Sequence, residues 1–120
     1  MSTTEGAKMD GRYITPQGYW LVESLLKVAD KEIEMVDVEQ YANRGWFNIR
    51  TVSELVSHTG RIDNVMLRIP VLLSPDGDVI DGRHRVAKAI MLGYKQIPAR
   101  RIAKMPEPDG QSAGEWRRVG

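Results

Sequence analysis

Apolar residues in the first third of the chain follow first a helical spacing and then an alternating one. Thr15-Pro16 is typical of a helix cap with proline in the first turn, and apolar residues follow at helical spacing, so a helix is expected over residues 16–30. The segment 33–38 is short, rich in branched residues and partly alternating, which predicts a strand.

Residues 51–81 carry the signals of a second helix and of a hairpin. Thr51 and Glu54 stand at the spacing of a capping box, and the apolar face that follows predicts a helix ending near Gly60. Two apolar runs flank the turn sequence SPDG, so residues 68–81 are expected to form a hairpin.

After Gly82 the chain returns to helical spacing. The apolar stripe ends at Gly93, which is typical of a helix C-cap, and the segment QIPARRI that follows predicts a strand. Helices and strands are thus mixed around a central hairpin. This order predicts an α+β fold, a small mixed sheet with packed helices.

The length of 120 residues allows one hydrophobic core and is too short for two independent domains. The ends, residues 1–12 and 105–120, are rich in Gly, Pro and small polar residues without periodicity, so both are expected to be flexible and outside the core. The folded domain is then expected over residues 13–104.

The amino-acid composition excludes several kinds of functional site. The chain has no cysteine, which excludes disulfides, thiol nucleophiles and cysteine-ligated metals, and its two histidines argue against a histidine-built metal site. No stretch approaches the roughly 18 apolar residues of a membrane span, and the first residues lack the apolar core of a signal peptide. A cytoplasmic protein with no membrane partner is expected.

The net charge of +1 hides an asymmetry between the two halves of the chain. Residues 1–60 carry 6 Lys and Arg against 9 Asp and Glu, whereas residues 61–120 carry 11 against 7. An anionic ligand is therefore expected to bind the second half.

The most informative segment runs from Ile80 to Arg85, where a strand is expected to pass through Gly82 into the first turn of a helix. Backbone N–H groups in that turn lack intrahelical partners and the helix dipole is positive there, so the turn attracts anions. Arg83, His84 and Arg85 stand where each cation opposes the dipole by roughly 0.3–1 kcal/mol. Their crowding favours a phosphate ligand, which would reverse the sign of the charge.

A purely structural interpretation of these residues stays open. Asp81 would then be the N-cap of the helix and Gly82 a bend, and the arginines would be solvated or paired with Asp78 and Asp81.

The segment 70–102 resembles the core of the ParB/sulfiredoxin superfamily. The family pattern is a proline-led strand, an Asp-Gly turn, a strand ending in Gly, a helix opening with a His-Arg or Arg-Arg pair, then Gly and a strand beginning at Ile-Pro. This sequence has these parts in order at Pro70, Asp76-Gly77, Gly82, His84-Arg85, Gly93 and Ile97-Pro98. With the strand and helix upstream, the resemblance extends over residues 33–103.

The resemblance implies nucleotide binding. The family uses the glycine and the basic turn to bind the phosphates of CTP in ParB proteins, of ATP in sulfiredoxins and of ADP or ATP in the related free-serine kinases. By resemblance, Gly82, His84 and Arg85 contact phosphates, and magnesium is the expected metal ion. Small bacterial and phage ParB-like proteins share further motifs, which correspond here to Trp46-Phe47, His58 with Arg61, and the run from Asp81 to Arg85.

The sequence also departs from the family. Sulfiredoxins have a reactive cysteine where this chain has Arg83, so the chemistry differs from theirs. ParB proteins continue into a helix-turn-helix and a dimerisation domain, whereas 18 residues follow Ile102 here, which puts operator recognition in doubt. The catalytic Glu of the serine kinases has no clear counterpart.

Two further pairs have both a functional and a structural interpretation. His58 and Arg61 share one helix face and could reach the phosphate pocket, but a solvated surface is the alternative. Trp46-Phe47 could stack a base, but aromatic residues after a short loop often pack in the core.

Asp81 decides between two functional hypotheses. A carboxylate beside the phosphate-binding glycine would repel a triphosphate unless a cation lies between them, so Asp81 is expected to bind magnesium or to act as a base. The first hypothesis is a ParB-like domain that binds ATP or CTP as a DNA-associated or regulatory switch. The alternative is an NTP hydrolase or small-molecule kinase. Nucleic acid is expected to bind weakly and without sequence preference, and a homodimer stays open.

Overall fold

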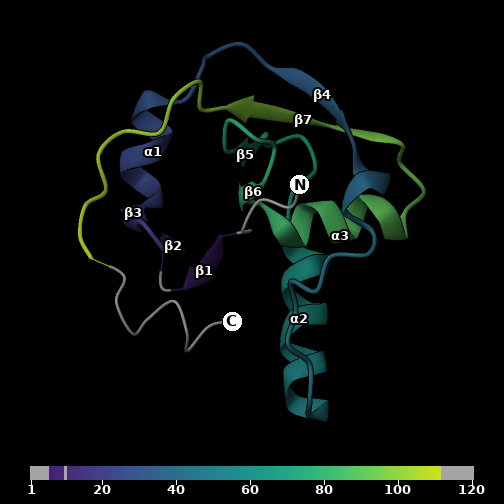
Figure 1. Ribbon diagram of the computed structural model, residues 1–120. Helices are drawn as coiled ribbons and strands as arrows, with labels where there is room; N and C mark the ends of the chain where they lie inside the picture. Colours follow the sequence, from purple (N-terminus) through teal and green to yellow (C-terminus); the bar gives the residue numbers. More distant parts are fainter. Residues whose placement is uncertain (1–5, 10, 112–120) are drawn as a thin grey trace.

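The computed structural model describes residues 6–9 and 11–111, which form two β-sheets with α-helices packed on them (Figure 1). The α+β class expected from the sequence is confirmed, and one of the sheets is mixed.

The first sheet is an antiparallel meander in the order β1-β2-β3. Its strands are β1 (Ala7–Met9), β2 (Arg12–Thr15) and β3 (Gly18–Leu21). Helix α1 (Val22–Val28) follows β3 directly and buries Val22 and Leu25.

The helix predicted over residues 16–30 is wrong in its first half. Thr15-Pro16 opens the turn of the β2–β3 hairpin, and Thr15 pairs with Gly18 across it. Gly18 has a φ of 145°, which favours glycine, and the aromatic residues of both strands favour extended backbone. The helical stripe is real, but it begins only at Val22.

The second sheet has the strand order β4-β7-β5-β6, with β5 and β7 parallel and the other pairs antiparallel. Its strands are β4 (Glu34–Asp37), β5 (Val71–Leu73), β6 (Val79–Asp81) and β7 (Gln96–Arg101). The predicted strand at 33–38, the hairpin within 68–81 and the last strand are confirmed.

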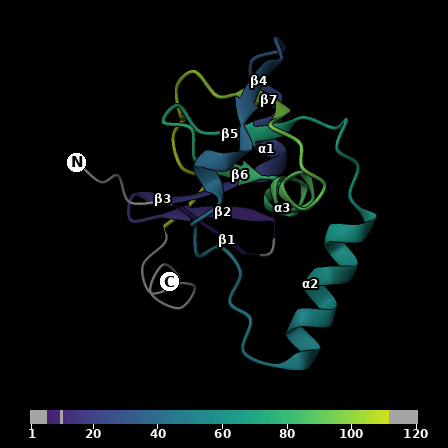
Figure 2. The ribbon, with the colours of Figure 1, turned by 90° about the vertical axis from the view of Figure 1, so that its right-hand side faces the viewer.

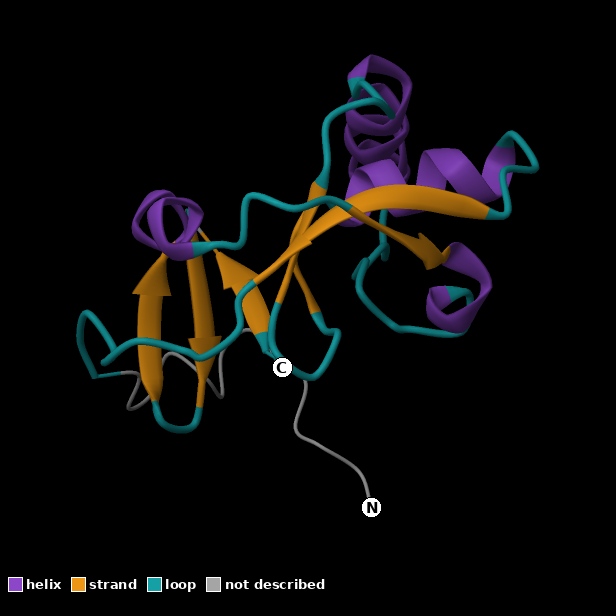
Figure 3. Cartoon of the chain, turned by 90° about the horizontal axis from the view of Figure 1, so that it is seen from above, coloured by secondary structure: helices purple, strands orange, loops and turns teal. Residues whose placement is uncertain are grey.

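The second sheet is buried on both faces. Val71, Leu73 and Val79 pack with the buried residues of α3 (Arg83–Met91) and of the 3₁₀ helix η1 (Val38–Tyr41), whereas Leu72 and Ile80 pack with the first sheet and α1. Successive residues of a strand point to opposite faces, so a strand between two layers reads as a continuous apolar run. Figure 3 shows the first sheet with α1 on one side and α2 with α3 on the other.

Helix α2 (Val52–Asn64) projects from the body and packs against α3 (Figures 1 and 2). The predicted capping box is confirmed, because Thr51 accepts from the Glu54 N–H and Glu54 accepts from the Thr51 N–H. The helix continues to Asn64, past the end predicted near Gly60. None of its residues is buried, and the side chain of Val52 is 78% exposed.

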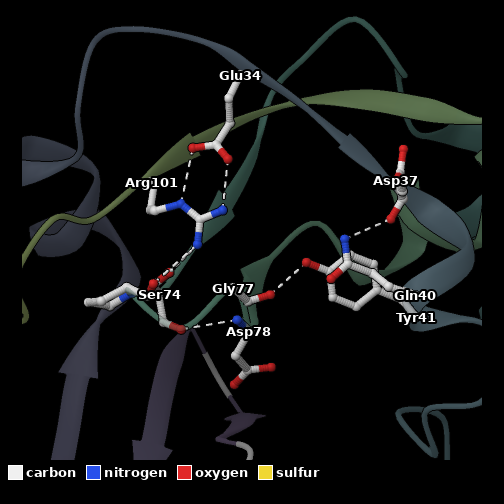
Figure 4. Close-up of polar contacts among 9 residues, drawn as sticks. Glu34, Asp37, Gln40, Tyr41, Ser74, Gly77, Asp78 and Arg101 are labelled. Atoms are coloured by element: carbon white, nitrogen blue, oxygen red, sulfur yellow. Dashed lines mark hydrogen bonds and ion pairs between the residues drawn. The ribbon is translucent and has the colours of Figure 1, made fainter.

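Three polar side chains fix the turn between β5 and β6, and we call Glu34, Arg101 and Tyr41 the turn clamp (Figure 4). Arg101 donates to both carboxylate oxygens of Glu34, at 2.7 and 3.0 Å, and to the carbonyl oxygens of Ser74 and Pro75. Tyr41 donates its hydroxyl to the carbonyl oxygen of Gly77 at 2.6 Å.

Parts of both predicted flexible ends belong to the fold. In the expected tail 1–12, β1 pairs with β2, and the Gly6 N–H donates to Asp78 at 2.9 Å. In the expected tail 105–120, the carbonyl oxygen of Pro106 accepts from the indole N–H of Trp20 at 2.8 Å. The hydrogen bonds of Gly6 and Pro106 join residues 72 and 86 positions apart, which no local pattern encodes. Residues 1–5, 10 and 112–120 lie outside the described part.

Within the described residues, no helix is both long enough and apolar enough to cross a membrane.

Candidate functional site

The site begins where β6 passes into α3. Gly82 is the N-cap of α3, is buried, and has a φ of 112°. A Cβ at this position would lie 2.6 Å from Cγ1 of Val71, closer than real Cβ contacts allow. Glycine is therefore required by both the backbone conformation and the lack of space.

Because the N-cap is glycine, no side chain caps the first turn of α3. The N–H groups of Arg83 and His84 point out of the helix end, where the helix dipole is positive. The structural alternative in which Asp81 is the N-cap is therefore wrong: Asp81 lies one residue earlier, at the end of β6.

A cavity of about 510 Å³ opens at this helix end, and we call it the α3 cavity. It brings together every residue that the sequence singled out for ligand binding, from the α3 turn and from helix α2, together with both aromatic residues of the preceding loop. Its lining consists of Gly11, Trp46, Phe47, His58, Arg61, Val65, Asp81, Gly82, Arg83, His84 and Arg85.

Arg83 is held by several contacts with the body of the fold. Its Nε donates to the Val79 carbonyl oxygen at 3.1 Å, its Nη2 donates to the Gly6 carbonyl oxygen at 2.7 Å, and Nη2 lies 3.8 Å from the Asp78 carboxylate. Its guanidinium also lies 5.1 Å from the ring centroid of Trp46. These contacts fix the charge in the cavity wall.

Arg85 is equally constrained. It donates to the carbonyl oxygens of Ile69 and Pro70 at 3.0 and 2.8 Å, and to Oδ2 of Asp81 at 3.2 Å. The pairing of the arginines with Asp78 and Asp81, expected in the structural interpretation, is therefore present. It does not exclude a ligand, because both guanidinium groups remain in the wall of the same cavity.

His58 and His84 meet across the interface between α2 and α3, and we call them the histidine pair. Nδ1 of His58 lies 2.9 Å from Nε2 of His84, within hydrogen-bond distance. The contact places His58 against the body of the fold, so the alternative of a purely solvated helix surface is wrong for this residue. Arg61 is exposed but also lines the cavity.

The aromatic residues of the loop before α2 form one wall. The Phe47 ring centroid lies 5.1 Å from that of His58 and 4.9 Å from that of His84. The Trp46 ring centroid lies 5.4 Å from that of Tyr41, with the ring planes tilted by 33°, and Trp46 packs against the core cluster. Both aromatic residues are partly buried and also line the cavity, and the stacking of a base on them stays a prediction.

Lys88 was missed by sequence analysis although it positions α2. Its Nζ donates to the carbonyl oxygens of Asp63 and Val65, at 2.8 and 3.0 Å, at the C-terminal end of that helix. A cation is favourable there because the last carbonyls have no intrahelical partner and the dipole is negative. No local pattern announces this contact, because it joins two elements more than twenty residues apart.

Asp81, expected as a metal ligand or base, has its carboxylate in contact with Arg85. Across residues 6–9 and 11–111, no group of three His, Cys, Asp or Glu side chains is placed to hold a metal ion. Magnesium commonly takes part of its ligands from the phosphate oxygens of a bound molecule.

No model of a known protein family matches this chain, and neither do the curated proteins or the solved structures. The ParB/sulfiredoxin resemblance therefore rests on the motif residues alone. The function of the cavity has to be inferred from its own geometry.

Proposed function

We propose that the α3 cavity binds the phosphate groups of a nucleoside triphosphate, ATP or CTP, and that the chain is a nucleotide-binding domain of the ParB-like type. The observation that carries the proposal is the convergence of the predicted phosphate-binding residues from α2 and α3 on one cavity at a glycine-capped helix end. A ligand approaching this end meets backbone N–H groups without an intervening side chain.

The charge of the lining supports an anionic ligand. Arg61, Arg83 and Arg85 line the cavity, and Asp81 is the only carboxylate among its described lining residues. Guanidinium groups favour phosphate because their planar N–H donors match its oxygens. Since Arg83 and Arg85 are already held in place, little side-chain entropy would be lost when the ligand binds.

The size and the wall chemistry support a nucleotide rather than free phosphate. A volume of about 510 Å³ lies within the range of small-molecule sites, roughly 300–1,000 Å³. Phe47 and Trp46 offer aromatic surface of the kind on which bases stack.

Magnesium would be held mainly by the phosphate oxygens, with Asp81 as the carboxylate of the lining. A magnesium ion commonly uses one or two carboxylates together with substrate phosphates. Turnover, the alternative hypothesis, would require Asp81 to exchange its contact with Arg85 for a proton or a metal ion.

The test is isothermal titration calorimetry with ATP and CTP, each with and without magnesium. We expect Arg61→Gln to weaken binding by about 1.5 kcal/mol, because one charge-assisted contact is lost. Arg61 is the variant of choice because, among the described residues, no hydrogen bond joins it to the rest of the fold, whereas Arg85 donates to the carbonyl oxygens of Ile69 and Pro70.

The matched control is Lys31→Gln, which removes the same charge from an exposed position outside the cavity lining. It should bind as the parent does. Failure of the parent to bind either nucleotide, or equal binding by Arg61→Gln, would contradict the proposal.

A further inference from the structure

The histidine pair is joined end to end. The two ring centroids are 5.2 Å apart, whereas the facing nitrogens are 2.9 Å apart. The centroid separation exceeds the nitrogen separation by about twice the distance from an imidazole centroid to its own nitrogen. Both facing nitrogens therefore lie on the line that joins the two ring centroids. The rings are inclined by only 22°. This is the geometry of a linear N–H···N hydrogen bond.

A linear bond restricts the protonation states of the pair. One proton lies between Nδ1 of His58 and Nε2 of His84, and a second proton on that line would place two N–H groups against each other. The pair is therefore either neutral or carries one added proton. In the neutral state only one of the two outer nitrogens, Nε2 of His58 and Nδ1 of His84, is a donor. In the charged state both are donors.

The charged groups that line the cavity around the pair come from three elements. Arg61 is on α2, Arg83 and Arg85 are on α3, and Asp81 is at the end of β6. Arg85 is paired with Asp81, and Arg83 lies 3.8 Å from the Asp78 carboxylate. A phosphate anion bound among these groups would favour an added proton on the pair.

Phe47 packs against both imidazoles, with ring centroids 5.1 and 4.9 Å apart and ring planes inclined by 57° and 41°. Phosphate oxygens accept hydrogen bonds and, when ionised, cannot donate them. They are therefore best matched by the state in which both outer nitrogens donate.

We propose that a phosphate-bearing nucleotide binds to the α3 cavity together with a proton, which is taken up by the His58–His84 pair. This inference rests on the proposed function and adds a regulation to it. By reciprocity, a ligand that favours the protonated pair binds more tightly when the pair is protonated. Affinity rises as the pH falls toward the range in which imidazoles are protonated, by at most about tenfold per pH unit.

The chain offers a clean test because it has only two histidines. Calorimetry with ATP or CTP at pH 7.5, in buffers of different ionisation enthalpy, measures the protons taken up on binding. In parallel, NMR follows the two sets of imidazole resonances during the nucleotide titration. We expect net proton uptake of up to about one per bound nucleotide and movement of both rings toward the shifts of the protonated form.

His58→Asn and His84→Gln are the matched variants, since each keeps an amide near the position of the facing nitrogen and removes one titrating ring. Either variant should lose most of the proton uptake and the steepening of affinity at lower pH. Phosphate groups themselves titrate near pH 6, but that contribution is common to the parent and the variants. Lys31→Gln should behave as the parent, and thermal unfolding confirms that each variant is folded.

The outcomes separate the two proposals. Nucleotide binding without proton uptake, with both histidine spectra unchanged, overturns this inference and leaves the proposed function standing. Proton uptake that persists in both histidine variants also overturns it. Failure of the parent to bind nucleotide contradicts the proposed function and this inference with it.

Discussion

Two polar clusters lie at opposite ends of strand β5, and they differ in how their charges are balanced. Beyond Leu73, the turn clamp pairs Arg101 with Glu34 and holds the carbonyl oxygens of the β5–β6 turn. Beside Val71, the α3 cavity gathers three arginines and two imidazoles around one carboxylate.

In the turn clamp, one cation, Arg101, is paired with one anion, Glu34. The hydrogen bonds from Arg101 hold the pKa of Glu34 below its ordinary value, and the same bonds raise the pKa of Arg101. Each partner thus stabilises the charged form of the other. A site of this kind fixes a turn and has no excess charge with which to attract a ligand.

The cavity is an unmatched cluster. Arg83 and Arg85 are paired with Asp78 and Asp81, and the fold holds both guanidinium groups through hydrogen bonds to backbone carbonyls. Arg61 and the two imidazoles stand beside them without a further carboxylate in the described lining. A cavity whose lining has more cationic than acidic side chains is therefore a better indication of an anion-binding site than a cluster of charged residues that are all paired.

We expect the largest difference in stability between the two ends of β5 when the glycine at each end is replaced by alanine. Gly77 and Gly82 both have positive φ, 89° and 112°, but a Cβ on Gly77 would lie 3.5 Å from Arg101 whereas one on Gly82 would lie 2.6 Å from Val71. We expect Gly77→Ala to lower the free energy of unfolding by about 1–2 kcal/mol from backbone strain alone. Gly82→Ala adds a steric clash and should cost about 2–5 kcal/mol.

Urea unfolding of the two variants measures this difference, with Gly77→Ala serving as the control for strain. Equal losses would show that the β6–α3 turn relaxes around a side chain and that the close approach to Val71 is not required. Nucleotide binding by Gly82→Ala should be weakened even where the variant remains folded, because the methyl group would also lie 3.2 Å from Cζ of Arg85 in the cavity lining.

The sequence predicted most of the local structure because the signals were local. The capping box at Thr51, the hairpin around SPDG and the start of α3 depend on residues within a few positions of each other. The β2–β3 hairpin was misassigned because Thr15-Pro16 suits both a helix start and a turn, and the choice depends on the packing of Tyr13 and Trp20 in the core.

The sequence predicted which residues belong to the site, but it did not predict the contacts between them. The i, i+3 spacing placed His58 and Arg61 on one helix face, which is enough to bring both to the cavity. The 2.9 Å contact of His58 with His84 joins residues 26 apart, and Arg83 reaches back to Gly6 across 77 positions. Such contacts arise from the packing of α2, β1 and α3, which no local pattern encodes.

A smaller effect is expected from removing the carboxylate of the unmatched cluster. Asp81→Asn keeps the shape and removes a negative charge that lies among the phosphate-binding residues, so nucleotide should bind more tightly without magnesium, by about 0.5–1 kcal/mol. Calorimetry in the presence of a chelator measures this change. Glu32→Gln, at an exposed position outside the cavity, is the control.

The same variant separates binding from catalysis. If Asp81 served as a base, Asp81→Asn would lower phosphate release or phosphoryl transfer by about 10²-fold at unchanged stability. We expect no turnover that depends on Asp81, since its carboxylate is in contact with Arg85. A loss of that size, measured against the parent, would establish the enzyme hypothesis in place of the switch.

The smallest effect is expected at the clamp, where Glu34→Gln removes a partly exposed ion pair. Exposed pairs contribute about 0.2–1 kcal/mol. Because the pKa of Glu34 is lowered in the folded state, its contribution is complete above the ordinary value of 4.5 and is lost as the pH falls through the lower, folded-state pKa. The difference in unfolding free energy between parent and variant should therefore be constant near neutrality and shrink toward zero below pH 4.5.

Urea unfolding at a series of pH values tests this, and nucleotide affinity at neutral pH should not change. A difference that grows on acidification, or weaker nucleotide binding by Glu34→Gln, would mean that the two ends of β5 are coupled and that the clamp does more than hold its turn.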